Sequence, residues 1–283
     1  MKILLATPAH GSQVCTAYHE SVVNTLMFFK SEYPGIEFES RMISLSMLSL
    51  VRSAFASMVL NDESFTHLLF IDSDMGFAPS LIAKMIAFQK PVVGIVAPRR
   101  RFDYAAYFKL GRTLDDPTTS RLLAADYIGE GQIITKRKEG GVTSYILKDG
   151  FVQTTFVGAG ILLIERSVFV AIRERFPELW VPDPGAHGSL VGLKGGLLNC
   201  FEPERGKDGI YPSEDVAFCR RWVEGCNGEI WANVDEFIVH VGTDQFIGKY
   251  LFKLIHEAAE FKKALEAEAQ AKDDFWKAGS SAL

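Results

Sequence analysis

The chain of 283 residues has little cysteine, no basic excess and no long hydrophobic run, and each absence removes a class of protein. Its four cysteines are scattered and form no CxxC pair, which excludes a zinc ribbon and a disulfide framework. The formal net charge of -5 argues against a duplex nucleic-acid surface, which normally carries a strong basic excess. We therefore expect no nucleic-acid partner.

The sequence also lacks membrane and linker signals. No stretch of about 20 apolar residues could span a bilayer, and the opening segment lacks the apolar core of a signal peptide. No Pro/Ser-rich linker marks a boundary. We therefore expect a cytoplasmic protein without a transmembrane segment, with one domain over residues 1–248 and a helical extension over residues 249–283.

Short apolar runs alternate with helical patterns over the first hundred residues. Buried strands are predicted at 2–6, 36–43, 67–71 and 92–96, and helices at 16–32, 50–61 and 79–89. This alternation predicts a mainly parallel sheet with helices on both faces. In such sheets ligands bind beyond the carboxyl ends of the strands.

The second half of the chain changes character. Gly-containing turns separate runs at 132–138, 142–147 and 151–157, which predicts an antiparallel β-meander insertion. A strand at 161–164 and a helix at 167–175 follow. The Gly- and Pro-rich residues 181–212 show little periodicity, and we expect them to form a long loop with little regular structure that covers a substrate.

Residues 245–278 are rich in Ala, Glu and Lys and are predicted to be helical. Their apolar positions, Leu251, Leu254, Ala258, Phe261 and Leu265, would pack on the domain or on a second copy in a homo-oligomer. The predicted fold class is thus α/β: a Rossmann-like, mainly parallel sheet with helices on both faces, a β-meander insertion and a C-terminal helical tail.

The apolar strand at 67–71 ends in Asp72, Ser73 and Asp74. Two carboxylates one residue apart at the end of a buried strand are costly unless a cation lies between them. Carboxylate oxygens suit Mn²⁺ or Mg²⁺, and such an ion neutralises a diphosphate as a nucleotide leaves. On spacing alone, a pair of solvated turn aspartates is the alternative.

Four segments in this order resemble GT-A glycosyltransferases with a DxD motif: HLLFIDSDMGF, FVGAGILLIERSVF, SEDVAFCRRW and VHVGTDQF. The resemblance is to bacterial, viral and fungal mannosyltransferase-type sequences and covers roughly residues 1–248. It implies a GT-A fold, Mn²⁺ (or Mg²⁺) as cofactor, and a UDP- or GDP-sugar as donor. The acceptor would be a saccharide or another molecule with a hydroxyl group.

The resemblance implies donor-binding roles for several residues. Thr7 and Pro8 would border the nucleotide, and Arg52 would lie near the nucleotide or its phosphates. Gly158 and Gly160 would let the backbone approach a ligand closely, although glycine at the start of a strand can also mark a bend.

The resemblance implies a metal site as well. Asp72, Ser73 and Asp74 would bind the donor, with Asp72 near the ribose and metal and Asp74 a direct metal ligand. His240 would supply a further metal ligand, whereas a histidine after apolar residues is otherwise usually a core residue. Many relatives have Arg-Asn where this chain has Arg52 and Ser53. The chain also lacks the aspartate that many relatives use after the second strand to recognise uracil, so the base of the donor is left open.

Glu214 and Asp215 follow Ser213, which can cap a helix whose dipole favours nearby carboxylates. That capping role alone would explain both acids. The resemblance implies instead that Asp215 is the general base for the attacking hydroxyl and that Glu214 binds the acceptor. Retention or inversion of the sugar's configuration stays open.

Two alternatives to sugar transfer remain at this point. Phosphatases of the haloacid-dehalogenase type also place DxD after an apolar strand, with the first aspartate as nucleophile, but normally on the first strand. A non-catalytic nucleotide-sugar-binding protein could keep the fold without the reaction.

Overall fold

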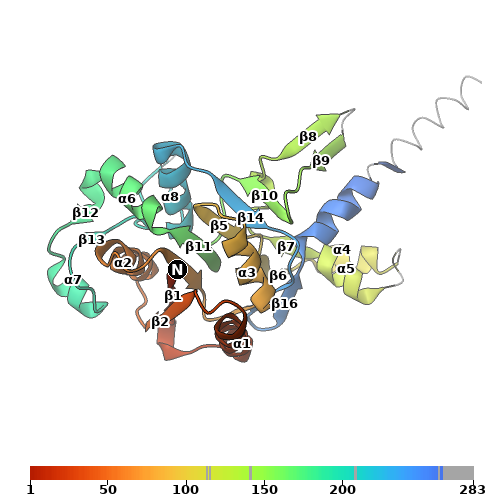
Figure 1. Cartoon of the computed structure of the whole chain (residues 1–283). Helices are drawn as coiled ribbons and strands as arrows, with labels where there is room; N and C mark the ends of the chain where they lie inside the picture. The colour runs from red at the N-terminus through yellow and green to blue at the C-terminus, as the bar shows by residue number, and fades with distance from the viewer. Residues whose placement is uncertain (113, 115, 140–141, 207–208, 261, 264–283) are drawn as a thin grey trace, which may run out of the picture.

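The computed structural model describes residues 1–283 except 113, 115, 140–141, 207–208, 261 and 264–283. Its centre is a seven-stranded sheet with the order β10-β14-β5-β11-β3-β1-β2 (Figure 1). The strands are β1 (Lys2–Pro8), β2 (Glu37–Ile43), β3 (His67–Ile71), β5 (Val92–Ile95), β10 (Phe151–Thr154), β11 (Ile161–Glu165) and β14 (Ile230–Asn233). The helices around it include α1 (Thr16–Glu32), α2 (Leu48–Asn61), α3 (Pro79–Ala87), α6 (Arg166–Arg175) and α8 (Glu214–Arg220).

The prediction of a mostly parallel α/β sheet is confirmed. Strands β1, β2, β3, β5 and β14 run in one direction, whereas β10 and β11 run in the other. Because β11 is antiparallel and lies between β3 and β5, its amino end lies at the edge where its neighbours end. The backbone N–H of Asp72, after β3, accordingly donates to the carbonyl of Gly160, before β11, at 2.8 Å.

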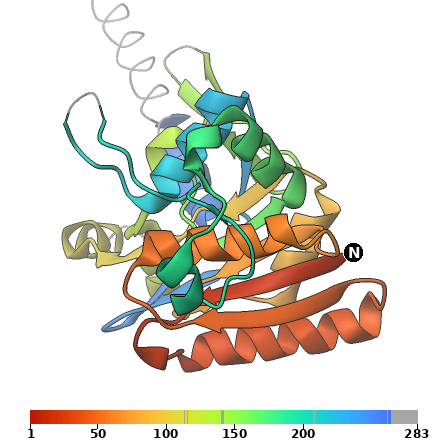
Figure 2. The ribbon, with the colours of Figure 1, turned by 90° about the vertical axis from the view of Figure 1, so that its left-hand side faces the viewer.

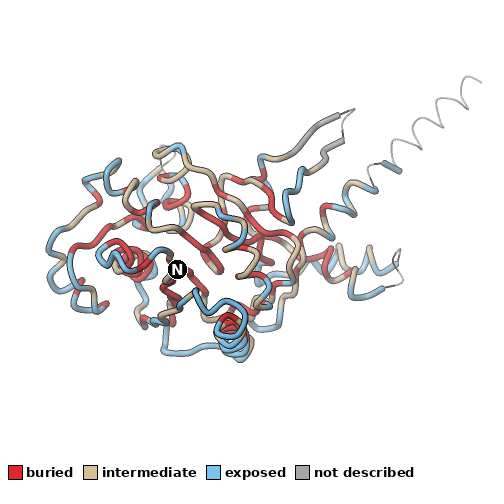
Figure 3. The backbone as a smooth tube through the Cα atoms, in the orientation of Figure 1, coloured by how far each residue is buried: buried red, intermediate tan, exposed pale blue. Residues whose placement is uncertain are grey.

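Each face of the sheet has its own apolar core, because alternate strand residues point to opposite faces. Ile3 and Leu5 of β1 join residues of α1 and α3, while Leu4 and Ala6 join residues of α2 and α6. Figure 2 shows α1 on one side of the strands and α2 on the other, and Figure 3 shows buried backbone concentrated between these layers.

The predicted meander is only partly present. Strands β8 (Lys136–Glu139) and β9 (Val142–Tyr145) form an antiparallel pair, but β10 pairs with β14 in the central sheet. Strand β10 joins the central sheet because this buries its apolar side chains: Phe151 lies in one core and Val152 in the other. In a separate hairpin both side chains would be exposed to water.

The segment 181–212 is more regular than predicted. It contains the end of β12 (Trp180–Val181), α7 (Gly185–Leu190) and β13 (Leu197–Leu198). The expectation of little regular structure was wrong because buried serines of α2 bind this backbone. The N–H of Leu198 donates to Ser57 Oγ at 2.8 Å, and the N–H of Phe201 donates to Ser53 Oγ at 3.2 Å.

A small antiparallel sheet lies beside the carboxyl end of β3. It consists of β4 (Met75–Gly76), β15 (Ile238–Val241) and β16 (Gln245–Gly248), with β15 in the middle. The helix predicted from residue 245 was therefore placed too early, since 245–248 form β16. In this sheet His240 is the register partner of Met75, directly after the DxD segment.

Residues 250–260 are helical, and the first turns pack on the domain. Tyr250 and Leu254 are buried, and the Tyr250 ring lies 4.8 Å from that of Tyr127. Phe261 and Leu265, and with them most of the proposed oligomer-forming tail, lie outside the described residues. Among the described residues, no helix is long and apolar enough to cross a bilayer.

Candidate functional site

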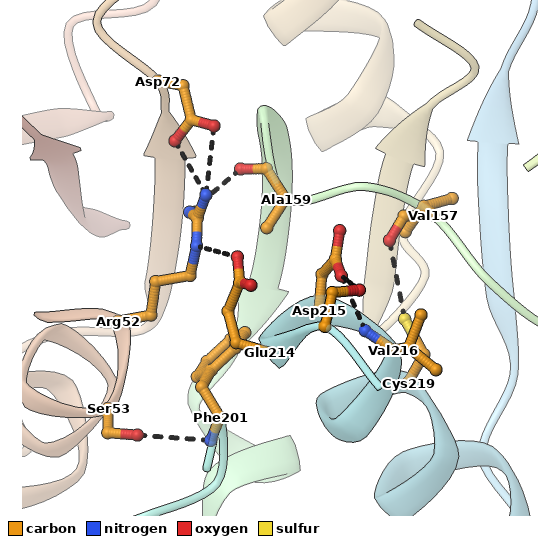
Figure 4. Close-up of polar contacts among 11 residues, drawn as sticks. Arg52, Ser53, Asp72, Val157, Ala159, Phe201, Glu214, Asp215, Val216 and Cys219 are labelled. Carbon is orange, nitrogen blue, oxygen red and sulfur yellow. Dashed lines mark hydrogen bonds and ion pairs between the residues drawn. The ribbon is translucent and has the colours of Figure 1, made fainter. Parts of the chain in front are cut away.

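Arg52 is the centre of the polar cluster at the carboxyl edge of the sheet (Figure 4). It lies on α2 and its side chain is 3% exposed. Its Nη2 donates to both carboxylate oxygens of Asp72 at 2.9 and 3.0 Å, and its Nε donates to Glu214 at 3.2 Å. Its Nη1 donates to the carbonyl of Ala159 at 3.2 Å. One guanidinium thus joins β3, α8 and the segment before β11.

The charges of this cluster depend on one another. Burial alone would lower the pKa of Arg52, but Asp72, Glu214 and Asp215 more than offset this effect and raise it. Burial raises the pKa of Asp72, against the opposing effect of Arg52. Asp72 therefore depends on Arg52 to hold a negative charge at this position.

Asp74 belongs to a second group of side chains. Its Oδ2 lies 3.4 Å from His240 Nε2 and 3.2 Å from Arg100 Nη1. The Nδ1 of His240 lies 2.8 Å from the carbonyl oxygen of Pro98, which can only accept, so Nδ1 carries a proton. In the neutral imidazole, Nε2 then presents its lone pair towards Asp74.

The neutral His240 Nε2 and the ionised Asp74 Oδ2 are both hydrogen-bond acceptors. They face each other and repel unless a cation or a proton lies between them. Burial alone would lower the pKa of His240, but hydrogen bonds to Asp74 and to the Pro98 carbonyl raise it. Burial would raise the pKa of Asp74, but His240 and Arg100 lower it. The site therefore favours positive charge beside Asp74, and Arg100 supplies one.

Asp215 lies near the Arg52 cluster, at the start of α8. Its Oδ1 accepts hydrogen bonds from the Ser213 hydroxyl and from the N–H of Val216 at 2.8 Å. Its Oδ2 lies 3.8 Å from the position that a Cβ would occupy on Gly158. A Cβ at that position would also lie 3.3 Å from Ile128 Cγ2, so Gly158, Ile128 and the Asp215 carboxylate lie close together.

Several predicted donor residues have packing roles in the structure. Thr7 is fully buried and its hydroxyl lies 2.6 Å from the Tyr18 hydroxyl, so its side chain cannot border a nucleotide in this state. Pro8 ends β1 opposite Ile43. A Cβ on Gly160 would lie 3.4 Å from Met75 Sδ, so this glycine fits its neighbour closely.

The DxD backbone is held from both sides. The carbonyl of Ser73 accepts from the N–H of Cys15 at 2.9 Å, which fixes it to the start of α1. The carbonyl of Asp74 accepts from the N–H of Val241 at 2.8 Å, which fixes it to β15. This backbone pairing is what brings His240 to Asp74.

The predicted three-residue metal set is not assembled. In the part of the chain that the structure describes, no group of three or more His, Cys, Asp or Glu side chains could hold a metal ion. The reason is that Asp72 is turned to Arg52, which binds both of its oxygens. Asp74 and His240 remain together and offer one oxygen and one nitrogen.

Sequence reasoning missed two backbone contributors and could not single out a third, an arginine. The carbonyls of Ala159 and Pro98 act through the backbone and leave no residue-type signal. Arg100 lies in β6 (Pro98–Phe102), shortly after β5, within a run of three arginines. Its position at the carboxyl edge indicates a ligand-facing residue, but the sequence does not show which arginine of the run faces Asp74.

Comparison with known proteins finds only weak structural likeness. No protein-family model matches the chain, and no curated protein matches it. Among solved structures, a protein from STIV is 12% identical, with a TM-score of 0.41 and 85% of each chain covered. A Bacillus anthracis protein assigned as a glucose-1-phosphate thymidylyltransferase is 10% identical, with a TM-score of 0.26, over 66% of this chain and 77% of that chain. Neither likeness bears on the chemistry of the site, which rests on its geometry.

Proposed function

We propose that the protein is a metal-dependent glycosyltransferase that moves a sugar from a UDP- or GDP-sugar to an acceptor hydroxyl. The observation that carries the proposal is the orientation of His240. Its Nδ1 is bound to the Pro98 carbonyl, so that Nε2 faces the Asp74 carboxylate at 3.4 Å. Metal-binding histidines are typically held by such a hydrogen bond from the other ring nitrogen.

The two donor atoms fit a manganese or magnesium site that shares its coordination with a ligand. Asp74 would supply a hard oxygen and His240 a neutral nitrogen, which suit Mn²⁺. Diphosphate oxygens and water would complete the shell, as is usual for ions that bridge phosphates. When bound, the ion would neutralise charge on the departing nucleoside diphosphate.

The remaining residues would position and deprotonate the acceptor. Arg52 holds Glu214 and the Ala159 carbonyl in fixed places around the DxD segment. Asp215 has one oxygen bound by Ser213 and Val216, and its Oδ2 lies beside Gly158. At this position Oδ2 would accept the proton of the attacking hydroxyl.

The phosphatase alternative fits this geometry less well. It requires the first aspartate of DxD to attack phosphorus. Both oxygens of Asp72 instead accept hydrogen bonds from a buried arginine, which lowers their nucleophilicity. A protein that only binds nucleotide sugars would need no general base. The transfer assay described next distinguishes such a protein from an enzyme.

Asp215→Asn should keep donor affinity within about twofold and reduce transfer at least a hundredfold, because the amide keeps the shape but accepts no proton. Single-turnover assays with UDP- and GDP-sugars, Mn²⁺ and a panel of saccharide acceptors separate binding from transfer. Asp62→Asn, at the exposed end of α2, is the matched control. Near-normal transfer by Asp215→Asn would leave Asp215 as a helix cap only.

A further inference from the structure

Arg100 is the arginine of its run that faces the DxD segment. Alternation along β6 places Arg99 and Arg101 near Asp126, at 3.6 and 3.9 Å, and Arg100 near Asp74, at 3.2 Å. The side-chain stem of Arg100 lies over Gly242, where a Cβ would be 2.9 Å from Arg100 Cδ. The absence of a side chain at Gly242 therefore gives Arg100 its path to Asp74.

Arg100 and His240 approach the same atom of Asp74. Both contacts, at 3.2 and 3.4 Å, are to Oδ2, which is the oxygen that an ion shared with His240 would use. A divalent ion bound there would lie close to the guanidinium, and two positive charges at a few ångströms repel strongly. Arg100 and the metal thus compete for one carboxylate oxygen.

The ion pair of Arg100 is of a kind that can be displaced. The Arg100 side chain is 57% exposed, and ion pairs of exposed side chains are weak because solvent screens them. Once displaced, the guanidinium remains at the carboxyl edge of the sheet, where the proposed donor would present its diphosphate. Guanidinium groups bind phosphate oxygens in a two-pronged geometry.

We propose that Arg100 pairs with Asp74 in the metal-free protein and pairs instead with the donor diphosphate when metal binds to Asp74. This inference rests on the proposed function. It makes metal and nucleotide binding cooperative: the nucleotide gives Arg100 another anion and so frees Asp74 for the metal. By linkage, the metal strengthens nucleotide binding by the same factor.

The test is Arg100→Gln, studied by calorimetry with MnCl₂ alone and with GDP or UDP in EDTA. Loss of the competing cation should strengthen binding of Mn²⁺ alone by about two- to fivefold. Loss of the phosphate partner should weaken metal-free nucleotide binding by roughly tenfold. The coupling factor between Mn²⁺ and nucleotide should fall.

Arg101→Gln is the matched control, since it removes the same charge one residue away, from a side chain that is 80% exposed and does not face Asp74. It should change each affinity by less than about twofold. Equal effects of the two variants, no effect of Arg100→Gln, or weakening of both ligands by it would overturn the proposal. A parent protein that binds neither Mn²⁺ nor nucleotide would instead refute the proposed function on which it rests.

Discussion

At the scale of single residues, Arg52 is the side chain on which most of the site depends. It is buried and bonded to Asp72, Glu214 and Ala159. Arg52→Met would leave two partly buried carboxylates without their cation, which typically costs about 3–5 kcal/mol. We expect a loss of that order in the free energy of unfolding, measured by urea denaturation at neutral pH.

Arg52→Lys serves as the graded control for this prediction. It keeps the charge but cannot reach three partners at once, so we expect a smaller loss than for Arg52→Met. If Arg52→Met unfolds at the same urea concentration as the parent, the buried network has no part in stability.

The pair formed by His240 and Asp74 predicts how stability of the metal-free protein depends on pH. The pKa of His240 is raised in the folded state, so its contribution is present below its unfolded pKa of about 6.5 and is lost as pH rises through the higher folded value. The stability difference between the parent and His240→Gln should thus be larger at about pH 5.5 than at about pH 8.5. Thermal unfolding in EDTA measures it.

The pKa of Asp74 is lowered, so its own contribution persists at about pH 5.5 and is lost only at more acidic pH. A stability difference between the parent and His240→Gln that does not vary with pH would show that His240 is not paired with Asp74 in solution.

At the scale of elements, α2 connects the site to the segment that carries β13. Ser57 on α2 accepts from the N–H of Leu198 at 2.8 Å, inside the core. Ser57→Ala would leave this buried N–H without an acceptor, which costs about 1–3 kcal/mol. We expect that loss in urea denaturation. Ser49→Ala, at a half-buried serine in the first turn of the same helix whose hydroxyl donates to Glu202, should stay within about 0.5 kcal/mol of the parent. An equal effect of both would contradict the core role of Ser57.

The elements that the sequence predicted best are those whose apolar spacing is long and uninterrupted. Helices α1 and α2 and strand β3 lie where the periodicity of residues 16–32, 50–61 and 67–71 places them. The segment with β13 was missed because its regularity comes from Ser53 and Ser57, more than 130 residues away in the chain. Partners at such distances leave no local pattern.

At the scale of the whole molecule, the sequence indicated the edge at which the site lies but not how its charges are divided. Asp72, Asp74, Glu214 and His240 do lie at this edge, linked by the contacts of Arg52 and by β15. Arg52 forms ion pairs with Asp72 and Glu214. Asp74 instead contacts His240 and Arg100. Residue type and order could not show this division, because it depends on side-chain directions set by packing.

In the proposed function, Asp74 and His240 form the protein's part of a metal site that binds a nucleoside diphosphate. The most direct test is a calorimetric titration of GDP and UDP into the parent and Asp74→Asn, with MnCl₂ and with EDTA, using Asp62→Asn as control. We expect Mn²⁺ to strengthen nucleotide binding to the parent and to the control by roughly tenfold or more. In Asp74→Asn this gain should be lost. A parent without any gain from Mn²⁺, or an Asp74→Asn variant that keeps the full gain, would contradict the proposed metal site.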